Sequence, residues 1–221
     1  MLGSKVNFKQ SKLPSKRNLK GKYVILEPLK IGKHSKDLYA NFSKDKKNII
    51  WSYLPYGPFK SYGSFKKWLK SFCLNKDPFF YAIYAKRRKQ YCGMVSYLRI
   101  TPEHGSIEVG HINYSPILQN TTEGTETMYL MKKNAFEVLG NRRYEWKCNN
   151  LNAGSKRAAL RLGFKFEGVF RQMFVFKGRN RDSAWFSIVD KEWKKIKNGY
   201  QNFLKPSNFD KNRKQKRKLK F

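Results

Sequence analysis

The chain has 221 residues, which is the length of one domain with short tails, and 40% of them are hydrophobic and 16% aromatic. So many aromatic residues support a sizeable core and exclude a wholly disordered protein. No segment approaches the run of about 18 apolar residues that a transmembrane helix needs, and the first residues show no apolar secretory segment. We therefore expect a cytoplasmic protein without membrane contacts.

Charge is the most unusual property of the sequence. The 48 Lys and Arg residues exceed the 15 Asp and Glu residues, so the net charge is +33. Residues 1–22 hold seven basic residues and no acidic one, and residues 191–221 hold twelve basic and two acidic residues. Such runs stay solvated and attract polyanions, so RNA or the ribosome is an expected partner. A generally lysine-rich composition is the alternative explanation.

The same runs suggest the domain boundaries. We expect a flexible basic arm over residues 1–21, one folded domain over residues 22–195 and a basic tail over residues 196–221. Within the tail, residues 205–221 hold too few apolar side chains to bury a core. That segment is therefore predicted to be disordered.

Three cysteines, Cys73, Cys92 and Cys148, are widely spaced and form no Cys-x-x-Cys motif. Their odd number and spacing argue against a disulfide framework and against a zinc site. We expect three free, buried thiols and no bound metal.

The first half of the chain predicts a meander of antiparallel strands. A strand begins near Tyr23, a short amphipathic helix lies within residues 33–47, and an irregular aromatic loop covers residues 51–59. Ser64 is expected to be the N-cap of a second helix. Three further strands are predicted over residues 79–85, 91–100 and 106–114.

The second half alternates helices with strands. Its strongest helix signal is an apolar stripe over residues 125–139 that ends at Gly140. There follow a strand over 142–148, a helix over 153–162, a long strand over 164–176 with a possible bend at Gly168, and a strand over 183–190. This order predicts a mixed α/β fold (an α+β sheet), with an antiparallel meander and a parallel β-α-β-α-β second half.

Four phrases, taken in this order, resemble the GNAT acyltransferases, and in particular the RimJ/RimL-like branch of ribosomal-protein alanine N-acetyltransferases. The phrases are IEVGHINYSP (107–116), LQNTTEGTETMYLM (118–131), NNLNAGSKRAALRLGFKFEG (149–168) and GRNRDSAWFSIVD (178–190). The resemblance implies the GNAT fold over about residues 22–195. It also implies transfer of an acetyl group from acetyl-CoA to a primary amine, either a protein N-terminus or a small amine, by a monomer or a homodimer. A non-catalytic RNA- or ribosome-binding protein on the same fold is the alternative.

By this resemblance, the segment from Gln119 to Gly124 stands where the family has its pyrophosphate loop. A loop that leads into a helix N-terminus offers free backbone N–H groups to phosphates. The family pattern is Gln/Arg-x-x-Gly-x-Gly/Ala, so Thr122 replaces a glycine and Glu123 places a carboxylate beside the phosphates. The expected acetyl-CoA-binding residues are Ile112, Tyr114, Gln119, Asn120, Thr121, Thr122, Glu123, Gly124, Thr125, Asn152 and Ser155.

Asn152 and Ser155 open the next predicted helix. Both residue types are common in the N-cap region of helices, and that role alone explains them. The resemblance implies more, namely that Asn152 bonds the pantetheine arm and that Ser155 protonates the departing thiolate. No tyrosine lies between Leu151 and Phe164, so Ser155 or a water is the remaining proton donor.

An ammonium group must lose a proton before it attacks a thioester, so a base is needed. Glu108 and His111 lie on the strand that should face the acetyl group. Their spacing of three places them on opposite faces of a regular strand, unless a β-bulge intervenes, as it does in the family. Glu108 matches the acidic position of the family's strand, whereas His111 has the more suitable ordinary pKa. A satisfied, half-buried histidine is the other interpretation of His111.

Aromatic residues precede the second predicted helix. In the family branch the equivalent segment walls the acceptor site, which assigns Trp51, Tyr53 and Tyr56 to substrate binding, although they could simply roof the core. Arg179 and Arg181 lie near the predicted final turn and could either bind an acidic acceptor or cap a hairpin. A cationic acceptor, such as a polyamine, should be repelled by so basic a protein unless its pocket is acidic.

Overall fold

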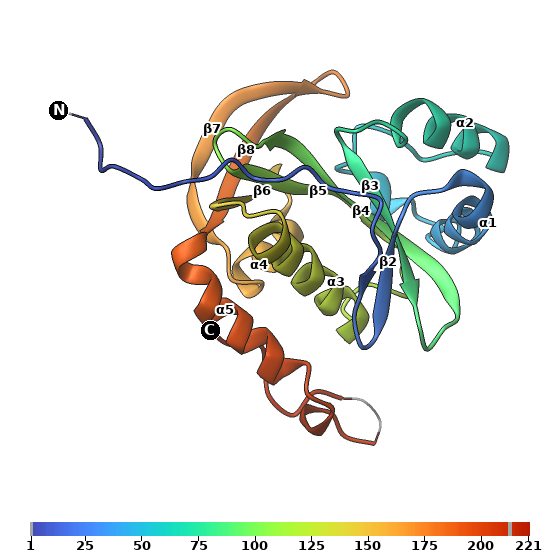
Figure 1. The fold of residues 1–221 in the computed structure, drawn as a ribbon. Helices are drawn as coiled ribbons and strands as arrows, with labels where there is room; N and C mark the ends of the chain where they lie inside the picture. The colour runs from blue at the N-terminus through green and yellow to red at the C-terminus, as the bar shows by residue number, and fades with distance from the viewer. Residues whose placement is uncertain (1, 212–213) are drawn as a thin grey trace.

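The structure, a computed structural model, describes residues 2–211 and 214–221. Arg213, one of the basic residues of the tail, lies outside the described residues. The described residues form one eight-stranded sheet in the order β1-β2-β3-β4-β5-β6-β8-β7 (Figure 1). The strands are β1 (Leu19–Lys20), β2 (Val24–Pro28), β3 (Phe79–Ala85), β4 (Gln90–Thr101), β5 (Ser106–Tyr114), β6 (Arg143–Asn149), β7 (Lys165–Phe176) and β8 (Arg179–Val189).

Helices cover both faces of this sheet. They are α1 (Ile31–Phe42), α2 (Tyr62–Phe72), α3 (Thr122–Lys133), α4 (Ala153–Arg161) and α5 (Asp190–Phe203). Figure 1 shows α1 and α2 on one side of the sheet and α3, α4 and α5 on the other. Two clusters of buried side chains correspond to these sides, one holding Leu38 and Phe65 and the other holding Met131 and Trp193. The two faces of one sheet thus carry two separate cores.

Two helices begin earlier than the sequence predicts. Helix α2 starts at Tyr62 because Ser61, and not Ser64, is its N-cap, and the Ser64 N–H donates to Ser61 Oγ at 3.2 Å. Helix α3 starts at Thr122, three residues before the predicted start, and Thr121 caps it. The helix therefore begins inside the predicted pyrophosphate loop.

Only one parallel pair occurs among the described strands. β5 and β6 are parallel, and their pairing runs from Ser106↔Arg143 to Val109↔Trp146. The predicted crossover through α3 is thus confirmed. The second predicted crossover has a different outcome, because β8 lies between β6 and β7 and is antiparallel to both. β6 and β7 therefore run in the same direction without hydrogen-bonding to each other.

Strand β5 carries a β-bulge at its centre. Ser96 of β4 is opposite Gly110, but Met94 is opposite Asn113, so two residues of β5 face a single residue of β4. His111 is one of these two residues, and it has a φ of 47°. The bulge on which the shared face of Glu108 and His111 depends is therefore present.

The N-terminal arm lies along the domain, whereas the sequence predicts a flexible segment. The Ser11 N–H donates to the Pro102 carbonyl at 3.1 Å and the Lys12 N–H to the Leu139 carbonyl at 2.7 Å. The ring of Phe8 lies over Gly105, where a side chain would collide with it. One aromatic residue and two backbone hydrogen bonds thus hold the basic arm in place.

The C-terminal segment also differs from its prediction. Helix α5 crosses the expected boundary at residue 195. Beyond the helix, the ring of Phe209 lies 6.1 Å from that of Tyr23, and the ring of Phe221 lies 5.5 Å from that of Tyr200. The described part of residues 205–221 is therefore packed, because a few apolar side chains reach the existing core although they cannot form one.

All three cysteines are free and buried, as predicted. Among the described residues, no group of three or more His, Cys, Asp or Glu side chains is arranged to hold a metal ion. No helix in the described part of the chain is long and apolar enough to cross a membrane.

Candidate active site

The site begins where two parallel strands separate. Pairing between β5 and β6 stops at Val109 and Trp146, yet β5 continues to Tyr114 and β6 to Asn149. The loop after β5 leads directly into the N-terminus of α3. An opening between two strands, with a helix N-terminus next to it, suits an extended ligand that ends in phosphates.

Backbone groups at the start of α3 are available to an anion. Thr121 Oγ1 accepts the Gly124 N–H at 3.1 Å, and the Thr125 N–H donates to the Thr121 carbonyl at 3.1 Å. The N–H groups of Thr122 and Glu123 find no acceptor among the described residues. Of the predicted cofactor residues, Thr121 is therefore the N-cap and Thr125 donates a backbone hydrogen bond of the first helical turn, while the N–H groups of Thr122 and Glu123 are free of bonds to described residues.

Packing around Gly124 is tight. A side chain there would lie 3.0 Å from the Leu118 carbonyl and 3.0 Å from the ring of Tyr114. The Tyr114 hydroxyl in turn donates to the Gly124 carbonyl at 3.0 Å. The tyrosine thus fixes the start of α3 against β5, and Ile112 projects toward the same core.

Charges around the loop are mixed. Gln119 and Asn120 are exposed, and the Gln119 amide donates to the Tyr114 carbonyl at 3.0 Å. Glu123 makes no ion pair with a described residue. Arg161 of α4 donates to Thr125 Oγ1 at 3.4 Å, which places one guanidinium beside the start of α3.

Ser155 sits at the start of α4 with its hydroxyl oriented by a neighbour. The indole Nε1 of Trp146 donates to Ser155 Oγ at 3.0 Å, so the hydroxyl proton points away from Trp146, and the Cys148 sulfur also lies within hydrogen-bonding reach of the serine. Asn152 is the N-cap of α4, and its Oδ1 accepts the Ser155 N–H at 3.0 Å. The capping interpretation of Asn152 is therefore correct for its oxygen, and its amide Nδ2 remains without a partner among the described residues.

Glu108 is a buried carboxylate held by two cations. It is 3% exposed, and its Oε2 lies 2.8 Å from Arg99 Nη1 and 3.0 Å from Lys147 Nζ. Burial raises the pKa of Glu108, and Lys147 and Arg99 oppose that rise. Both cations reach Oε2, so Oε1 is left without a hydrogen bond from a described residue and can accept one from a ligand or water.

The Glu108 pair belongs to a longer chain of charges across β4, β5, β6 and β7. Lys147 bridges Glu108 and Glu145, at 2.8 Å from the latter, and lies 3.7 Å from the centre of the Trp185 ring. Arg143 continues the chain by pairing with Glu145 at 2.6 Å and with Glu167 at 2.5 Å. Successive strands thus place alternating charges on one face of the sheet.

His111 lies in an aromatic surrounding. Its Nδ1 is 3.1 Å from the Tyr56 hydroxyl, and its ring centre is 5.3 Å from that of Phe72 and 5.4 Å from that of Phe80. Burial lowers the pKa of His111 to about 4, and the Arg99 charge acts in the same direction. The imidazole is therefore neutral near pH 7.

The three predicted acceptor residues have different environments. Trp51 is 4% exposed and packs in the core against Phe42, so for this residue the structural interpretation is correct. Tyr56 contacts His111, and Tyr53 is exposed and donates its hydroxyl to the Leu151 carbonyl at 3.2 Å. The aromatic loop thus reaches the start of α4 and joins the two sides of the site.

The β7–β8 hairpin reaches the same loop. Lys177 at its tip donates to the Trp51 carbonyl at 3.2 Å. Figure 1 shows the hairpin curving over the sheet toward the side of α2. The hairpin, the aromatic loop and β5 together bound the region in which Glu108 and His111 lie.

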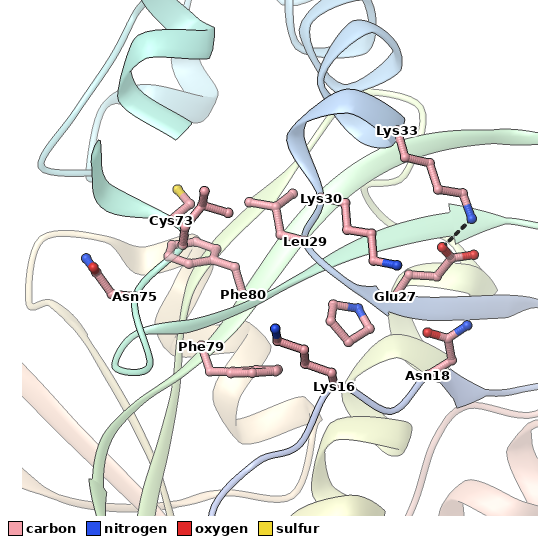
Figure 2. A pocket seen from close by; sticks show the side chains of 12 residues that line it. Lys16, Asn18, Glu27, Leu29, Lys30, Lys33, Cys73, Asn75, Phe79 and Phe80 are labelled. Atoms are coloured by element: carbon pink, nitrogen blue, oxygen red, sulfur yellow. Dashed lines mark hydrogen bonds and ion pairs between the residues drawn. The ribbon is translucent and has the colours of Figure 1, made fainter. Parts of the chain in front are cut away.

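A cavity of about 500 Å³ lies outside this region (Figure 2). Its lining combines an apolar floor with three lysines and one carboxylate, and Lys33 pairs with Glu27 at 2.6 Å. None of the predicted site residues lines it. Phe80 links the cavity to the site, since its ring also contacts that of His111.

Three residues of the site escaped the sequence analysis. Trp146 and Lys147 are neighbours on β6 that point to opposite faces, one toward Ser155 and the other toward Glu108. Arg99 has a φ of 47° and lies at an irregularity in β4. Successive side chains of a strand point to opposite faces, and this pattern is the sequence feature that would assign Trp146 and Lys147 to different sides of the sheet.

The comparisons with known proteins agree with this geometry. Residues 24–165 match the family model described as an acetyltransferase (GNAT) domain. A GCN5-related N-acetyltransferase from Brucella melitensis is 41% identical, with a TM-score of 0.94 and coverage of 96% of each chain. A probable acetyltransferase of the GNAT family from Chromobacterium violaceum is 39% identical with a TM-score of 0.81, covering 88% of this chain and 96% of that one.

A third solved structure is less similar. An acetyltransferase described as putative, from T. thermophilus, is 25% identical with a TM-score of 0.77, covering 86% of this chain and 98% of that one. No curated protein matches the chain.

Proposed function

The chain belongs to the GNAT acetyltransferase family, and we propose that it transfers the acetyl group of acetyl-CoA to the primary amine of a protein N-terminus or of a small molecule. The enzyme is an acyltransferase, and acetyl-CoA is its acetyl donor. The observation that carries the proposal is the separation of β5 from β6 beside the free N–H groups of Thr122 and Glu123.

Acetyl-CoA is positioned by contacts at its pyrophosphate end and at its thioester end. The pyrophosphate binds at the start of α3, where free N–H groups and the positive end of the helix dipole favour negative charge. The pantetheine arm extends between β5 and β6 and approaches the free Nδ2 of Asn152. The thioester then lies between Ser155 on one side and the bulge at His111 and Ile112 on the other.

The reaction is a direct attack of the amine on the thioester carbonyl. The bulged backbone near Ile112 supplies an N–H group that polarises the carbonyl oxygen. The attacking nitrogen forms a bond to the carbonyl carbon and passes a proton, directly or through a water, to the free Oε1 of Glu108. The carbon–sulfur bond then breaks as the carbonyl re-forms, and Ser155 passes its hydroxyl proton to the departing thiolate while a water returns a proton to the serine oxygen. Glu108 releases its proton to solvent, so both side chains regain their starting states.

Glu108 is a better base than His111 in this site. The imidazole of His111 has a pKa lowered to about 4 by burial, so it retains a proton poorly at neutral pH. The raised pKa of Glu108 moves that carboxylate closer to the working pH. His111 and Tyr56 instead form an aromatic wall on the acceptor side.

A RimJ/RimL-like role, acting on the N-terminus of a ribosomal protein, is part of the proposal. Its support is the four phrases of the sequence. A departure from the branch is that the stretch from Val169 to Phe174 carries no acidic residue, whereas some ribosomal-protein enzymes have one there. The exact acceptor is therefore a question for a panel of amines.

Binding to RNA or to the ribosome is a second proposed property, favoured by the net charge of +33. The described basic residues of the C-terminal segment from residue 214 onward are exposed. A polyanion bound there raises the local concentration of ribosomal acceptors near the active site.

Two measurements test the function. Isothermal titration calorimetry should show that acetyl-CoA binds, and the ligand should raise the melting temperature by mass action. Release of free thiol should then be followed with a panel of amines and N-terminal peptides. Absence of both heat and thermal shift at millimolar acetyl-CoA would overturn the proposal.

A further inference from the structure

The face of the sheet that carries Glu108 and His111, called here the acceptor face, holds a network in which three carboxylates pair with three cations. The carboxylates are those of Glu108, Glu145 and Glu167, and the cations are those of Arg99, Lys147 and Arg143. Arg181, on β8, makes no side-chain hydrogen bond or ion pair with any described residue, and its Nε is buried without a partner. One guanidinium on this face therefore lacks an anion.

The neighbouring acid does not supply that anion. Asp182 Oδ1 accepts the Gln172 N–H at 2.8 Å and the Asn180 Nδ2 at 3.0 Å. These two bonds show that Asp182 and Asn180 hold the hairpin together without Arg181. Capping of the hairpin, one of the two roles that the sequence leaves open for Arg181, is thus performed by its neighbours.

Packing fixes the position of the Arg181 side chain. Its guanidinium carbon lies 5.4 Å from the ring centre of Phe174 and 5.5 Å from that of Phe176. A planar guanidinium stacked on aromatic rings keeps its edge available for two parallel hydrogen bonds. The group is therefore preorganised, and it cannot turn into bulk solvent without losing these contacts.

Arg181 lies on the acceptor side of the site. It follows Phe176 and Lys177 on the hairpin whose tip contacts the Trp51 carbonyl. It is also near enough to Glu108 and Arg99 for their charges to act on its pKa, which burial lowers. An arginine nevertheless remains charged at neutral pH.

A second unpartnered group lies two residues further along β8. Ser183 is 0% exposed, and its Oγ has no hydrogen-bond partner among the described residues. It pairs across the sheet with Asn149, at the end of β6 where the strands have separated. Buried polar groups are nearly always hydrogen-bonded, so these two groups are available to a water or a ligand at this end of the sheet.

We infer that Arg181 binds a carboxylate of the acceptor, so that the amine acetylated by this enzyme also carries a carboxylate group. The inference rests on the proposed acetyl transfer and narrows its substrate class. The guanidinium donates two hydrogen bonds to the carboxylate oxygens, and the Ser183 hydroxyl donates a third. The acceptor amine is directed toward Glu108. A polyamine has no group to match Arg181.

The carboxylate has two chemical sources, which the assay separates. One is the α-carboxylate of a free amino acid, and its matched control is the corresponding amino acid amide. The other is an acidic side chain next to a peptide N-terminus, and its matched control is the peptide with Asn in place of Asp. In the matched pair that represents the true acceptor, the amide member should have a kcat/KM at least tenfold lower than the carboxylate member. This loss corresponds to a charge-assisted bidentate pair.

The Arg181→Met variant should abolish this preference. Its kcat/KM for the carboxylate acceptor should fall to that of the wild-type enzyme with the amide, while its rate with the amide changes little. Arg179→Met, an exposed arginine on the same hairpin, is the matched control and should keep the preference. Arg181→Lys keeps the charge but lacks the planar guanidinium, so its preference for the carboxylate acceptor should lie between those of the wild-type enzyme and Arg181→Met. The lysine variant replaces Arg181→Met in the test if the methionine variant fails to fold.

Two results would overturn the inference. One is equal acetylation of both members of each acceptor pair by the wild-type enzyme. The other is a loss of activity in Arg181→Met that is the same for carboxylate and amide. Calorimetry with acetyl-CoA keeps this test separate from that of the proposed function, because Arg181→Met should bind the donor as tightly as the wild-type chain.

Discussion

The indole Nε1 of Trp146 donates a hydrogen bond to Ser155 Oγ at 3.0 Å, linking β6 to the first turn of α4 across the end of the strand opening. Because the oxygen already accepts this bond, the hydroxyl proton is directed away from Trp146. A serine held in this way is set to protonate a leaving group that lies between the two strands.

Ser155→Ala should therefore lower kcat roughly 10- to 100-fold and leave the dissociation constant of acetyl-CoA nearly unchanged. Trp146→Phe should give a smaller loss in kcat, since the hydroxyl stays but loses its orientation. Steady-state kinetics with calorimetry of acetyl-CoA binding checks both. Ser71→Ala, on the exposed side of α2, is the control. A normal kcat in Ser155→Ala would assign the proton donor to water.

Glu108→Gln should cut turnover about 100-fold, whereas His111→Gln should have a smaller effect because an imidazole with a pKa of about 4 is a weak base at pH 7. The acetyl-CoA affinity should stay the same in both variants. Equal, small losses would mean that the amine arrives neutral and that no side chain is needed as a base.

The pH dependence provides a separate test of Glu108. A base must be deprotonated, so activity should fall as the pH drops below the raised pKa of Glu108. Lys147 lowers that pKa, so Lys147→Met should move the acidic limb of the kcat/KM profile to higher pH. Lys165→Met removes a surface ion pair with Glu192 and should leave the limb in place. If the acidic limb of the kcat/KM profile stays at the same pH in Lys147→Met, Glu108 is excluded as the group whose titration produces that limb.

The sequence predicts those features that depend on near neighbours in the chain. The apolar stripe of α3, the Asn152 cap and the paired strands β3, β4 and β5 follow from local residue patterns, and the bulge at His111 follows from the resemblance. The Trp146–Ser155 bond does not, because its donor lies in a strand and its acceptor in a helix that only the fold brings together.

Longer-range contacts explain the remaining differences. Glu126 of α3 accepts the backbone N–H groups of Lys22, Tyr23 and Val24 at 2.7, 2.6 and 2.8 Å, and these residues lie more than 100 positions away. The C-terminal segment is similar, since a few aromatic residues among many lysines suffice to attach it once the core exists. The amino-acid composition of residues 205–221 says nothing about the part of the domain against which the segment packs, so composition alone predicts disorder.

Glu123 places a negative charge in the first turn of α3, where the phosphates of acetyl-CoA are expected. Glu123→Gln should therefore lower the dissociation constant of acetyl-CoA by roughly 2- to 5-fold at low ionic strength, with a smaller effect at high salt because screening weakens the repulsion. Calorimetry at two salt concentrations measures this. Glu103→Gln, on the exposed turn between β4 and β5, is the control. Weaker binding in Glu123→Gln would show that the carboxylate supports the loop.

Lys132 is a buried amine whose removal should stabilise the fold. Lys132 is 0% exposed, and its Nζ donates to the Tyr200 hydroxyl at 2.9 Å. Burial lowers the pKa of Lys132 well below its ordinary value. A lysine with a lowered pKa costs stability at every pH below its unfolded-state pKa of about 10.4, because the unfolded chain binds the extra proton. Lys132→Met should raise the free energy of unfolding by about 1–3 kcal/mol at pH 7.

That gain should shrink as the pH rises toward 10.4, since the unfolded lysine then also loses its proton. Denaturant melts at pH 7 and pH 10 measure the difference. The Tyr200 hydroxyl keeps its bond to the Leu162 carbonyl at 3.1 Å in the variant, so no polar group is left unpaired. A destabilised Lys132→Met protein at pH 7 would show that the ammonium is satisfied as it stands.

Binding of RNA is tested best by changing charge and not by truncation. Phe221 packs against Tyr200, and its ring lies next to Gly163, so deletion of the segment would expose the core. The exposed basic residues can instead be replaced by glutamine with Phe221 kept in place. The five to change are Lys214, Lys216, Arg217, Lys218 and Lys220.

Each basic residue that contacts a phosphate releases about 0.7 of a counterion from single-stranded RNA, so the variant with five replacements should flatten the plot of log K against log salt by up to about 3.5. Fluorescence anisotropy with a labelled single-stranded RNA across a salt series measures that slope. Acetylation of a free peptide should be unchanged, because the active site lies on other elements. A variant with five exposed lysines of α1 and α2 replaced, namely Lys33, Lys36, Lys66, Lys67 and Lys70, controls for net charge. If both variants lose the same slope, the +33 charge attracts RNA without a defined site, and the C-terminal segment does not direct the enzyme to its acceptors.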